Sequence, residues 1–198
     1  MTIVFLILIG YLIGSIPSGL IAGKLISGID IRDHGSGNMG GTNAFRVLGV
    51  KGGMIVTSAD IIKGLIPAYL GLILAGELGA IITGASAIFG HAYPLFAGLR
   101  GGKSVATGTG VFLVIMPVAI GISAIIFFAT LVITQYVSLA SLLGALTLVV
   151  SSIVLKQSIW KVIVSILVFV FVVYRHRGNI ERLLYGRETK AKLWKRRF

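Results

Sequence analysis

The densest group of side chains able to bind an anion lies in residues 35–46, which read GSGNMGGTNAFR. Glycines such as Gly35 and Gly37 permit positive φ angles, so consecutive backbone N–H groups can converge on one anion. Arg46 adds a guanidinium that can hold a phosphate through two hydrogen bonds. The neutral donors of the segment are Ser36, Asn38, Thr42 and Asn43. A flexible linker is the alternative, but linkers are more often Gly and Ser alone. We interpret the segment as a phosphate-binding loop.

A second candidate anion site is the segment GLRGGKS in residues 98–104, which directly precedes an apolar run. An amide-rich turn with Lys103 at the start of a helix favours an anion through its backbone donors and the helix dipole. Gly101, Gly102 and Ser104 complete this turn. A nucleotide-binding P-loop is excluded, because its first glycine is replaced by Ala97 and no strand precedes it. A basic turn retained in the cytoplasm by its charge is the alternative.

A third candidate begins where the last apolar run ends, in residues 174–181. His176 and Asn179 are three residues apart, so they share a face if this segment is helical. His176 titrates near neutral pH and could act as an acid, a base or a phosphate donor. A basic cluster at the membrane interface explains the neighbouring arginines equally well.

Other polar residues are weaker candidates. Asp60 and Lys63 are spaced i, i+3 within an apolar run, where an unpaired charge is costly, so we favour an ion pair over a substrate contact. His91 stands at the end of a run, and we interpret it as an interfacial residue. Side chains that could line a cavity at the cytoplasmic interface are Gln135, Tyr136, Ser138 and Ser141.

The elements that must position these residues are strongly apolar. The 198 residues are 56% hydrophobic and only 12% charged, with a mean hydropathy of +1.00, which one water-soluble core could not accommodate. Apolar runs cover residues 3–21, 54–75, 78–89, 105–134, 137–155 and 159–174. We therefore predict an all-α polytopic membrane protein, with a single transmembrane domain over residues 1–198 and a basic cytoplasmic tail from about residue 175.

The net charge of +12 does not indicate nucleic-acid binding, because nine of the 18 Lys and Arg residues lie in residues 175–198 and most others flank apolar runs. This placement follows the positive-inside rule. No cysteine is present, which excludes disulfides, thiolate metal sites and a cysteine nucleophile.

The first apolar run lacks the basic region of a signal peptide, so we interpret it as an uncut span. Its pairs of small residues, Gly10 with Gly14 and Gly19 with Gly23, have the spacing that lets helix backbones approach closely in lipid. We assign these glycines to helix packing.

The loop arrangement predicts the topology. Two runs separate the first basic loop from the second, so both loops can face the cytoplasm. A cytoplasmic tail then requires the run in residues 105–134 to be split near Met116-Pro117 or Gly121, since Pro removes a helix hydrogen bond and Gly tolerates a turn. We predict seven transmembrane helices, with the N-terminus outside and the C-terminus in the cytoplasm. Five spans with a re-entrant element are the alternative, because each half would rise only about 22 Å.

Several motifs in matching order resemble the bacterial acyl-phosphate:glycerol-3-phosphate acyltransferases, from about Gly14 to Arg187. The segments that carry the resemblance are residues 14–19, 35–46, 101–103, 136–141 and 174–180. The resemblance implies transfer of a fatty acyl group from long-chain acyl phosphate to the 1-hydroxyl of glycerol 3-phosphate, giving lysophosphatidic acid. It further implies an enzyme of phospholipid synthesis in the bacterial inner membrane, in contact with membrane lipid and with its active site on the cytoplasmic face.

The resemblance also implies which residues act. Ser36 and Arg46 match the first motif, Gly101, Gly102 and Lys103 the phosphate loop, and His176 and Asn179 the third motif, in which Glu181 has a structural role. No cofactor and no metal are implied. This chain departs from the family in having Ser104 where glycine is usual, Gly41 where alanine is usual, and Gln135 where a basic residue is frequent.

Two other classes of protein fit parts of this pattern. An anion or phosphate transporter would place polar groups at mid-membrane on broken helices, whereas the polar motifs here gather at one predicted face. A small structural subunit of a membrane complex would use the glycine-rich loops only as connections. An acyl-CoA-dependent enzyme is disfavoured, since no His-x-x-x-x-Asp pair occurs.

Overall fold

The computed structural model describes residues 2–191, and every regular element among them is a helix. The chain divides into two compact units, one ending at Ile115 and the other beginning at Met116. The first unit contains α1 (Thr2–Gly14), α2 (Ser18–Ser27), α3 (Gly41–Val47), α4 (Gly49–Ala92) and α5 (Val105–Ile115), with short 3-10 helices at Ile31–Asp33 and Leu95–Ala97. The second contains α6 (Pro117–Thr134), α7 (Val137–Val154), α8 (Ile159–Arg175) and α9 (Arg177–Leu184).

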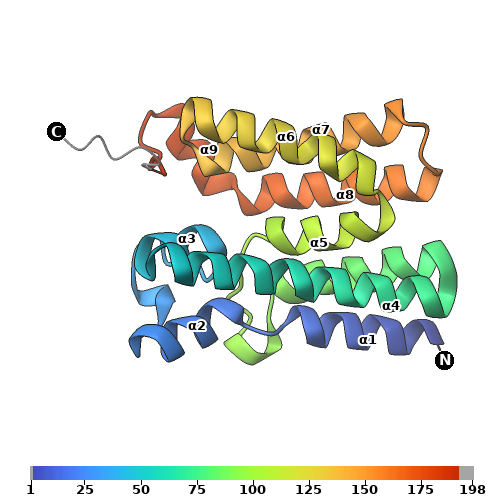
Figure 1. The fold of residues 1–198 in the computed structure, drawn as a ribbon, viewed down its shortest axis with the longest axis horizontal. Coiled ribbons are helices and arrows are strands. Elements are labelled where there is room, and N and C mark those ends of the chain that lie inside the picture. The colour runs from blue at the N-terminus through green and yellow to red at the C-terminus, as the bar shows by residue number, and fades with distance from the viewer. Residues whose placement is uncertain (1, 192–198) are drawn as a thin grey trace. The chain divides into compact units, whose positions relative to one another are not determined.

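The long helix α4 is a helical hairpin. Its backbone leaves helical geometry at Ala75 and at Gly76, where φ is 66° and ψ is −156°. A Cβ built on Gly71 would lie 2.3 Å from the carbonyl oxygen of Gly79, although these residues would be about 12 Å apart along a straight helix. Figure 1 shows the ribbon turning back at this point. Residues 49–75 and 77–92 thus form two antiparallel segments, as the two separate apolar runs predicted.

Small residues bring the helices of the first unit together. A Cβ on Gly10 or Gly14 of α1 would lie 2.4 Å and 2.2 Å from the carbonyl oxygens of Thr83 and Ala87 in the second half of α4. Gly19 of α2 approaches the Met39 carbonyl in the same way. No larger side chain fits at such positions, so the assignment of these glycines to packing is confirmed.

The first apolar run forms two helices, α1 and α2, although Thr2–Ser27 still counts as one segment long and apolar enough to cross a membrane. It breaks between Gly14 and Ser18, where Pro17 occupies the N-cap of α2. The carbonyl oxygen of Ile16 in this break accepts a hydrogen bond from Lys63 Nζ at 2.7 Å. The missing N–H of proline and this side-chain donor together explain why the helix stops here.

The predicted split of residues 105–134 is confirmed. Met116 has φ −148° and ψ 64°, and Pro117 is the first residue of α6. The two products are unequal, because α5 has 11 residues and α6 has 18. At 1.5 Å per residue, α5 rises only about 16 Å and α6 about 27 Å.

Four segments within the described residues are long and apolar enough to cross a membrane, or five if α8 and α9, bent by 62°, form one span. The α4 hairpin belongs to a single segment in that count, and α5 is too short to enter it. Large apolar side chains such as Ile133 (80% exposed) and Ile125 (68% exposed) cover the outer surface. This exposure is what a lipid solvent favours.

The second unit is joined by serines that reach across helices. Ser123 Oγ on α6 donates a hydrogen bond to the Gly144 carbonyl on α7. Ser152 and Ser165 hydroxyls lie 3.2 Å apart between α7 and α8. Short polar side chains of this kind associate helices in an apolar solvent.

Candidate active site

The buried side chain of Asn43 holds the first predicted anion loop in shape. Its Nδ2 donates to the carbonyl oxygens of Ile31 and His34, each at 3.0 Å, and its Oδ1 accepts from Ser36 N–H at 2.8 Å. Gly35 has φ 64°. Asn43 was predicted to bind substrate; in the structure its amide makes these three backbone contacts and holds the loop in shape.

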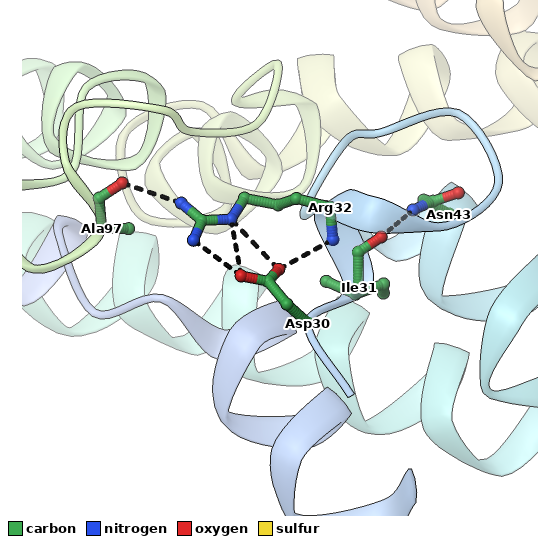
Figure 2. A network of polar contacts seen from close by, with 5 residues as sticks. All are labelled: Asp30, Ile31, Arg32, Asn43 and Ala97. Carbon is green, nitrogen blue, oxygen red and sulfur yellow. Dashed lines mark hydrogen bonds and ion pairs between the residues drawn. The ribbon is translucent and has the colours of Figure 1, made fainter. Parts of the chain in front are cut away.

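Two charged residues that sequence reasoning did not single out tie this loop to the next. Arg32 Nη1 donates to the Ala97 carbonyl at 3.0 Å, and its Nη2 lies 2.7 Å from Asp30 Oδ2 (Figure 2). The hydrogen bond from Arg32 is the main reason that the pKa of Asp30 is lowered. Asp30 also caps the 3-10 helix by accepting from Arg32 N–H at 2.9 Å. Both candidate anion loops are therefore connected within the first unit.

The second loop has a backbone that only a few residue types adopt without strain. Gly98, Leu99 and Ser104 have φ angles of 62°, 59° and 62°. Ser104 was predicted to bind substrate, but its hydroxyl is buried and donates to the Ile88 carbonyl at 2.8 Å. Gly102 N–H donates to the His91 carbonyl at 3.1 Å. The loop is thus fastened to the end of α4 before α5 begins.

The remaining predicted residues of these loops lie nearer the surface. Ser36, Thr42 and Arg46 are exposed, with Arg46 in the last turn of α3, and Lys103 is half-buried. Asn38 is half-buried, and its Oδ1 accepts from Gly40 N–H at 2.8 Å. The cations are therefore reachable by solutes, whereas Asn43 and Ser104 point into the protein.

Behind the second loop lies a buried polar cluster. The predicted ion pair is confirmed, because Lys63 Nζ and Asp60 Oδ1 are 2.8 Å apart. His91 was expected at the interface, but its side chain is only 5% exposed and its Nδ1 lies 3.5 Å from Asp60 Oδ1. The α4 hairpin explains this correction, since it brings the end of the second segment beside the middle of the first.

In the second unit, His176 and Asn179 lie at the junction of α8 and α9 and are both buried. Asn179 N–H donates to the His176 carbonyl at 2.8 Å, so the two residues share one turn, as their spacing predicted. His176 Nδ1 lies 2.8 Å from the Val172 carbonyl oxygen. A carbonyl can only accept, so the proton of the neutral ring resides on Nδ1 and the lone pair on Nε2.

Glu188 is a residue of this unit that sequence reasoning missed. Its Oε1 accepts from Asn179 Nδ2 at 2.7 Å and from Ser138 Oγ at 2.9 Å, and its Oε2 accepts from Arg182 Nε at 2.8 Å. Burial alone would raise its pKa, but the hydrogen bonds from these three donors outweigh burial and lower the pKa. Glu181, which was expected to have a structural role, is exposed on α9, whereas Glu188 makes these three hydrogen bonds.

Ser141 lies on α7, and its side chain turns back on its own helix. Its hydroxyl is buried and donates to the Val137 carbonyl at 2.8 Å. Ser138, one turn earlier, is the serine of this stretch that contacts Glu188. Ser141, His176 and Asn179 thus belong to the second unit, and Arg46 and Lys103 to the first.

Comparison with known proteins identifies the family of the chain. The family described as glycerol-3-phosphate acyltransferase matches residues 4–186. The chain belongs to this family. It is 48% identical to the glycerol-3-phosphate acyltransferase of Bacillus cytotoxicus over 191 residues, which cover 96% of each chain. It is 45% identical to that of Bacillus subtilis over 192 residues, covering 97% of this chain and 99% of the relative.

Solved structures agree with this family assignment. The crystal structure of PlsY (YgiH), an integral membrane glycerol 3-phosphate acyltransferase, in its glycerol 3-phosphate form superposes with a TM-score of 0.92 at 37% identity, covering 96% of both chains. Its lysophosphatidic acid form gives a TM-score of 0.90 at 36% identity, covering 96% of this chain and 95% of that one. The interpretation as a membrane acyltransferase is confirmed, and the transporter alternative is not supported.

Proposed function

We propose that this acyltransferase moves a long-chain acyl group from acyl phosphate to the 1-hydroxyl of glycerol 3-phosphate and releases lysophosphatidic acid and inorganic phosphate. The observation that carries this choice of donor is the pair of amide-rich loops in the first unit, joined by the bond from Arg32 to the Ala97 carbonyl. Two loops of this kind suit two phosphate groups, one on each substrate. Phosphate groups alone account for both loops, so no nucleotide need bind to either.

We propose that Arg46 and Lys103 neutralise the substrate phosphates, because both cations are accessible and each follows a run of backbone donors. Ser36 is proposed to act beside Arg46 by donating a hydrogen bond from its hydroxyl to the same phosphate. Gly35, Asn38, Thr42 and Gly101 complete the binding through backbone and side-chain donors, whereas Gly37 and Gly102, whose N–H groups donate to the His34 and His91 carbonyls, shape the turns around the phosphates. Asn43 and Ser104 act on the substrates only through the loop shapes that they stabilise.

The reaction needs no acyl-enzyme, because acyl phosphate is already an activated mixed anhydride. The glycerol oxygen attacks the carbonyl carbon, the bond from that carbon to the phosphate oxygen breaks, and phosphate leaves with the electron pair. The hydroxyl proton passes either to His176 Nε2 or to an oxygen of the leaving phosphate. Asn179 and Ser141 are proposed to bind substrate in the second unit.

We also propose how the helices cross the membrane. Counting α1 with α2, the two segments of α4, α5, α6, α7 and α8 gives seven spans in one transmembrane domain. The N-terminus would lie outside and both candidate loops in the cytoplasm of a bacterial cell, in its inner membrane. The acyl chain would lie against apolar helix surface in contact with membrane lipid.

A donor assay tests the proposed reaction. Purified protein without added metal is given glycerol 3-phosphate with either palmitoyl phosphate or palmitoyl-CoA, and lysophosphatidic acid is measured. We expect product with acyl phosphate only, because a coenzyme A donor needs an adenine and pantetheine surface that the short loops do not offer. Efficient use of acyl-CoA with none of acyl phosphate would overturn the proposal.

A further inference from the structure

The buried cluster of Asp60, Lys63 and His91 lies directly behind the loop that carries Lys103. The side chains of Asp60, Lys63 and His91 are only 2%, 6% and 5% exposed. Burying three titratable groups is costly unless they pair, and here they do. The three side chains therefore lie in a fixed arrangement inside the protein and are not hydrated like surface charges.

Each contact of the cluster leads to the next, from the α1–α2 break to the second loop. Lys63 Nζ donates to the Ile16 carbonyl at 2.7 Å and lies 2.8 Å from Asp60 Oδ1. Asp60 Oδ1 is in turn 3.5 Å from Nδ1 of His91. The imidazole is thereby oriented by a carboxylate that is itself anchored by a lysine.

The edge of the His91 ring that carries Nε2 packs against the turn at Gly101 and Gly102. A Cβ built on Gly102 would lie 2.1, 2.9 and 3.1 Å from Nε2, Cε1 and Cδ2 of His91, so the ring packs against the Gly102 backbone. The Gly102 N–H donates to the His91 carbonyl at 3.1 Å. His91 of α4 thus contacts the turn immediately before Lys103 twice, through its ring and through its backbone carbonyl.

We propose that His91 is a positioning residue for the Lys103 turn and that Asp60 and Lys63 hold its imidazole in place. The inference rests on the proposed function, in which Lys103 binds a substrate phosphate. It adds that the accuracy of this phosphate contact depends on an imidazole that touches backbone and no substrate. A displacement of about 1 Å at a catalytic group can cost about a hundredfold in rate.

Gly102 and Gly101 provide a matched pair of variants for the test. In Gly102→Ala the new methyl group meets the His91 ring, so removing that ring in the double variant with His91→Ala opens the space again. In Gly101→Ala the new methyl group meets the carbonyl oxygens of His91 and Ala92 at 2.1 and 2.5 Å. Backbone atoms persist in every variant, so His91→Ala cannot relieve this second clash.

We expect Gly102→Ala to lower kcat/KM about a hundredfold, and the added His91→Ala to restore it at least about tenfold, which lies within the range of coupling energies between contacting residues. The same addition should leave Gly101→Ala unrestored. His91→Ala alone should lower kcat/KM at temperatures where melting curves show the protein fully folded. His91→Asn should retain more activity than His91→Ala, because a side-chain amide nitrogen can replace Nδ1 beside Asp60 Oδ1.

Three outcomes would overturn the inference. They are equal rescue of both glycine variants, no rescue of Gly102→Ala, and wild-type kcat/KM for folded His91→Ala. Lys103→Ala is measured alongside as a separate check. Normal activity of Lys103→Ala defeats the proposed role of this loop, whereas an inactive Lys103→Ala with unaffected His91 variants defeats only the positioning role.

Discussion

At the scale of single residues, the candidate loops separate groups that shape the backbone from groups that can reach a solute. Asn43 and Ser104 direct their polar atoms to backbone carbonyls and amides inside the protein. Arg46 is exposed and Lys103 is half-buried. The two kinds of residue should therefore respond differently to substitution, the first through stability and the second through turnover.

For the cations, we expect Arg46→Ala and Lys103→Ala each to reduce kcat/KM by about tenfold to about 160-fold, because a hydrogen bond to a charged group contributes about 1.5–3 kcal/mol. Melting temperatures should change little. Lys51→Ala, which removes an exposed lysine in the first turn of α4, is the matched control and should retain activity. Near-normal kinetics in both loop variants would contradict the assignment of the two loops to phosphate binding.

For Ser104, the φ of 62° and the buried hydrogen bond act in opposite directions. Ser104→Gly loses a bond worth about 1 kcal/mol but relieves left-handed strain of about 1–2 kcal/mol. Ser104→Ala loses the bond and keeps the strain. We expect Ser104→Ala to melt about 2–4 °C below Ser104→Gly in detergent, as about 1 kcal/mol predicts for a chain of this size. An alanine variant as stable as the glycine variant would show that no strain is present.

At the scale of elements, the chain turns back once in each unit and brings candidate residues of that unit together. The turn at Gly76 places His91 beside Asp60, and the segment after α9 returns so that Glu188 meets Ser138 and Asn179. Ala191 N–H also donates to the Gln135 carbonyl at 2.8 Å, which fastens this segment to the connection between α6 and α7. In both places the chain brings together residues whose separation in sequence does not match the repeat of a single helix.

The return of Glu188 has a pH dependence whose sign follows from its lowered pKa. A carboxylate whose pKa is lower in the folded protein makes its full contribution to the free energy of unfolding at pH values above its unfolded-state pKa of about 4.3. That contribution is lost as the pH falls through the folded-state pKa. We expect wild type to melt above Glu188→Gln at pH 7, with the difference shrinking below about pH 4.3. Melting temperatures across a pH series measure this. A difference that grows on acidification would contradict the expected sign.

At the scale of the whole molecule, the apolar helix surfaces and the basic segments specify an orientation in the bilayer. Exposed side chains such as Ile133 and Ile125 require lipid around the helices. The basic residues flank the spans at the loops and in the tail. From this placement and from parity we propose seven spans, with the N-terminus and the C-terminus on opposite sides of the membrane.

This topology can be tested by labelling, since the chain has no cysteine of its own. Single cysteines introduced in residues 24–53, in residues 91–104 and in the tail should react with an impermeant thiol reagent only after the cytoplasmic face is opened. A cysteine in the short connection between α7 and α8, at Gln157, is the control and should react from outside. Labelling of the tail from outside would contradict the seven-span arrangement.

Composition and local motif were enough to predict a helical membrane protein, its packing glycines, the break at Pro117 and the acyltransferase family, because each depends on the solvent or on residues close in sequence. The Asp60–Lys63 pair was predictable for the same reason, as both lie on one helix face. The tertiary structure alone revealed that His91 is buried, that Asn43 is enclosed by its own loop and that Glu188 holds Asn179. These contacts join residues whose distance is decided by how the chain turns back, and no periodicity within a single helix encodes that turn.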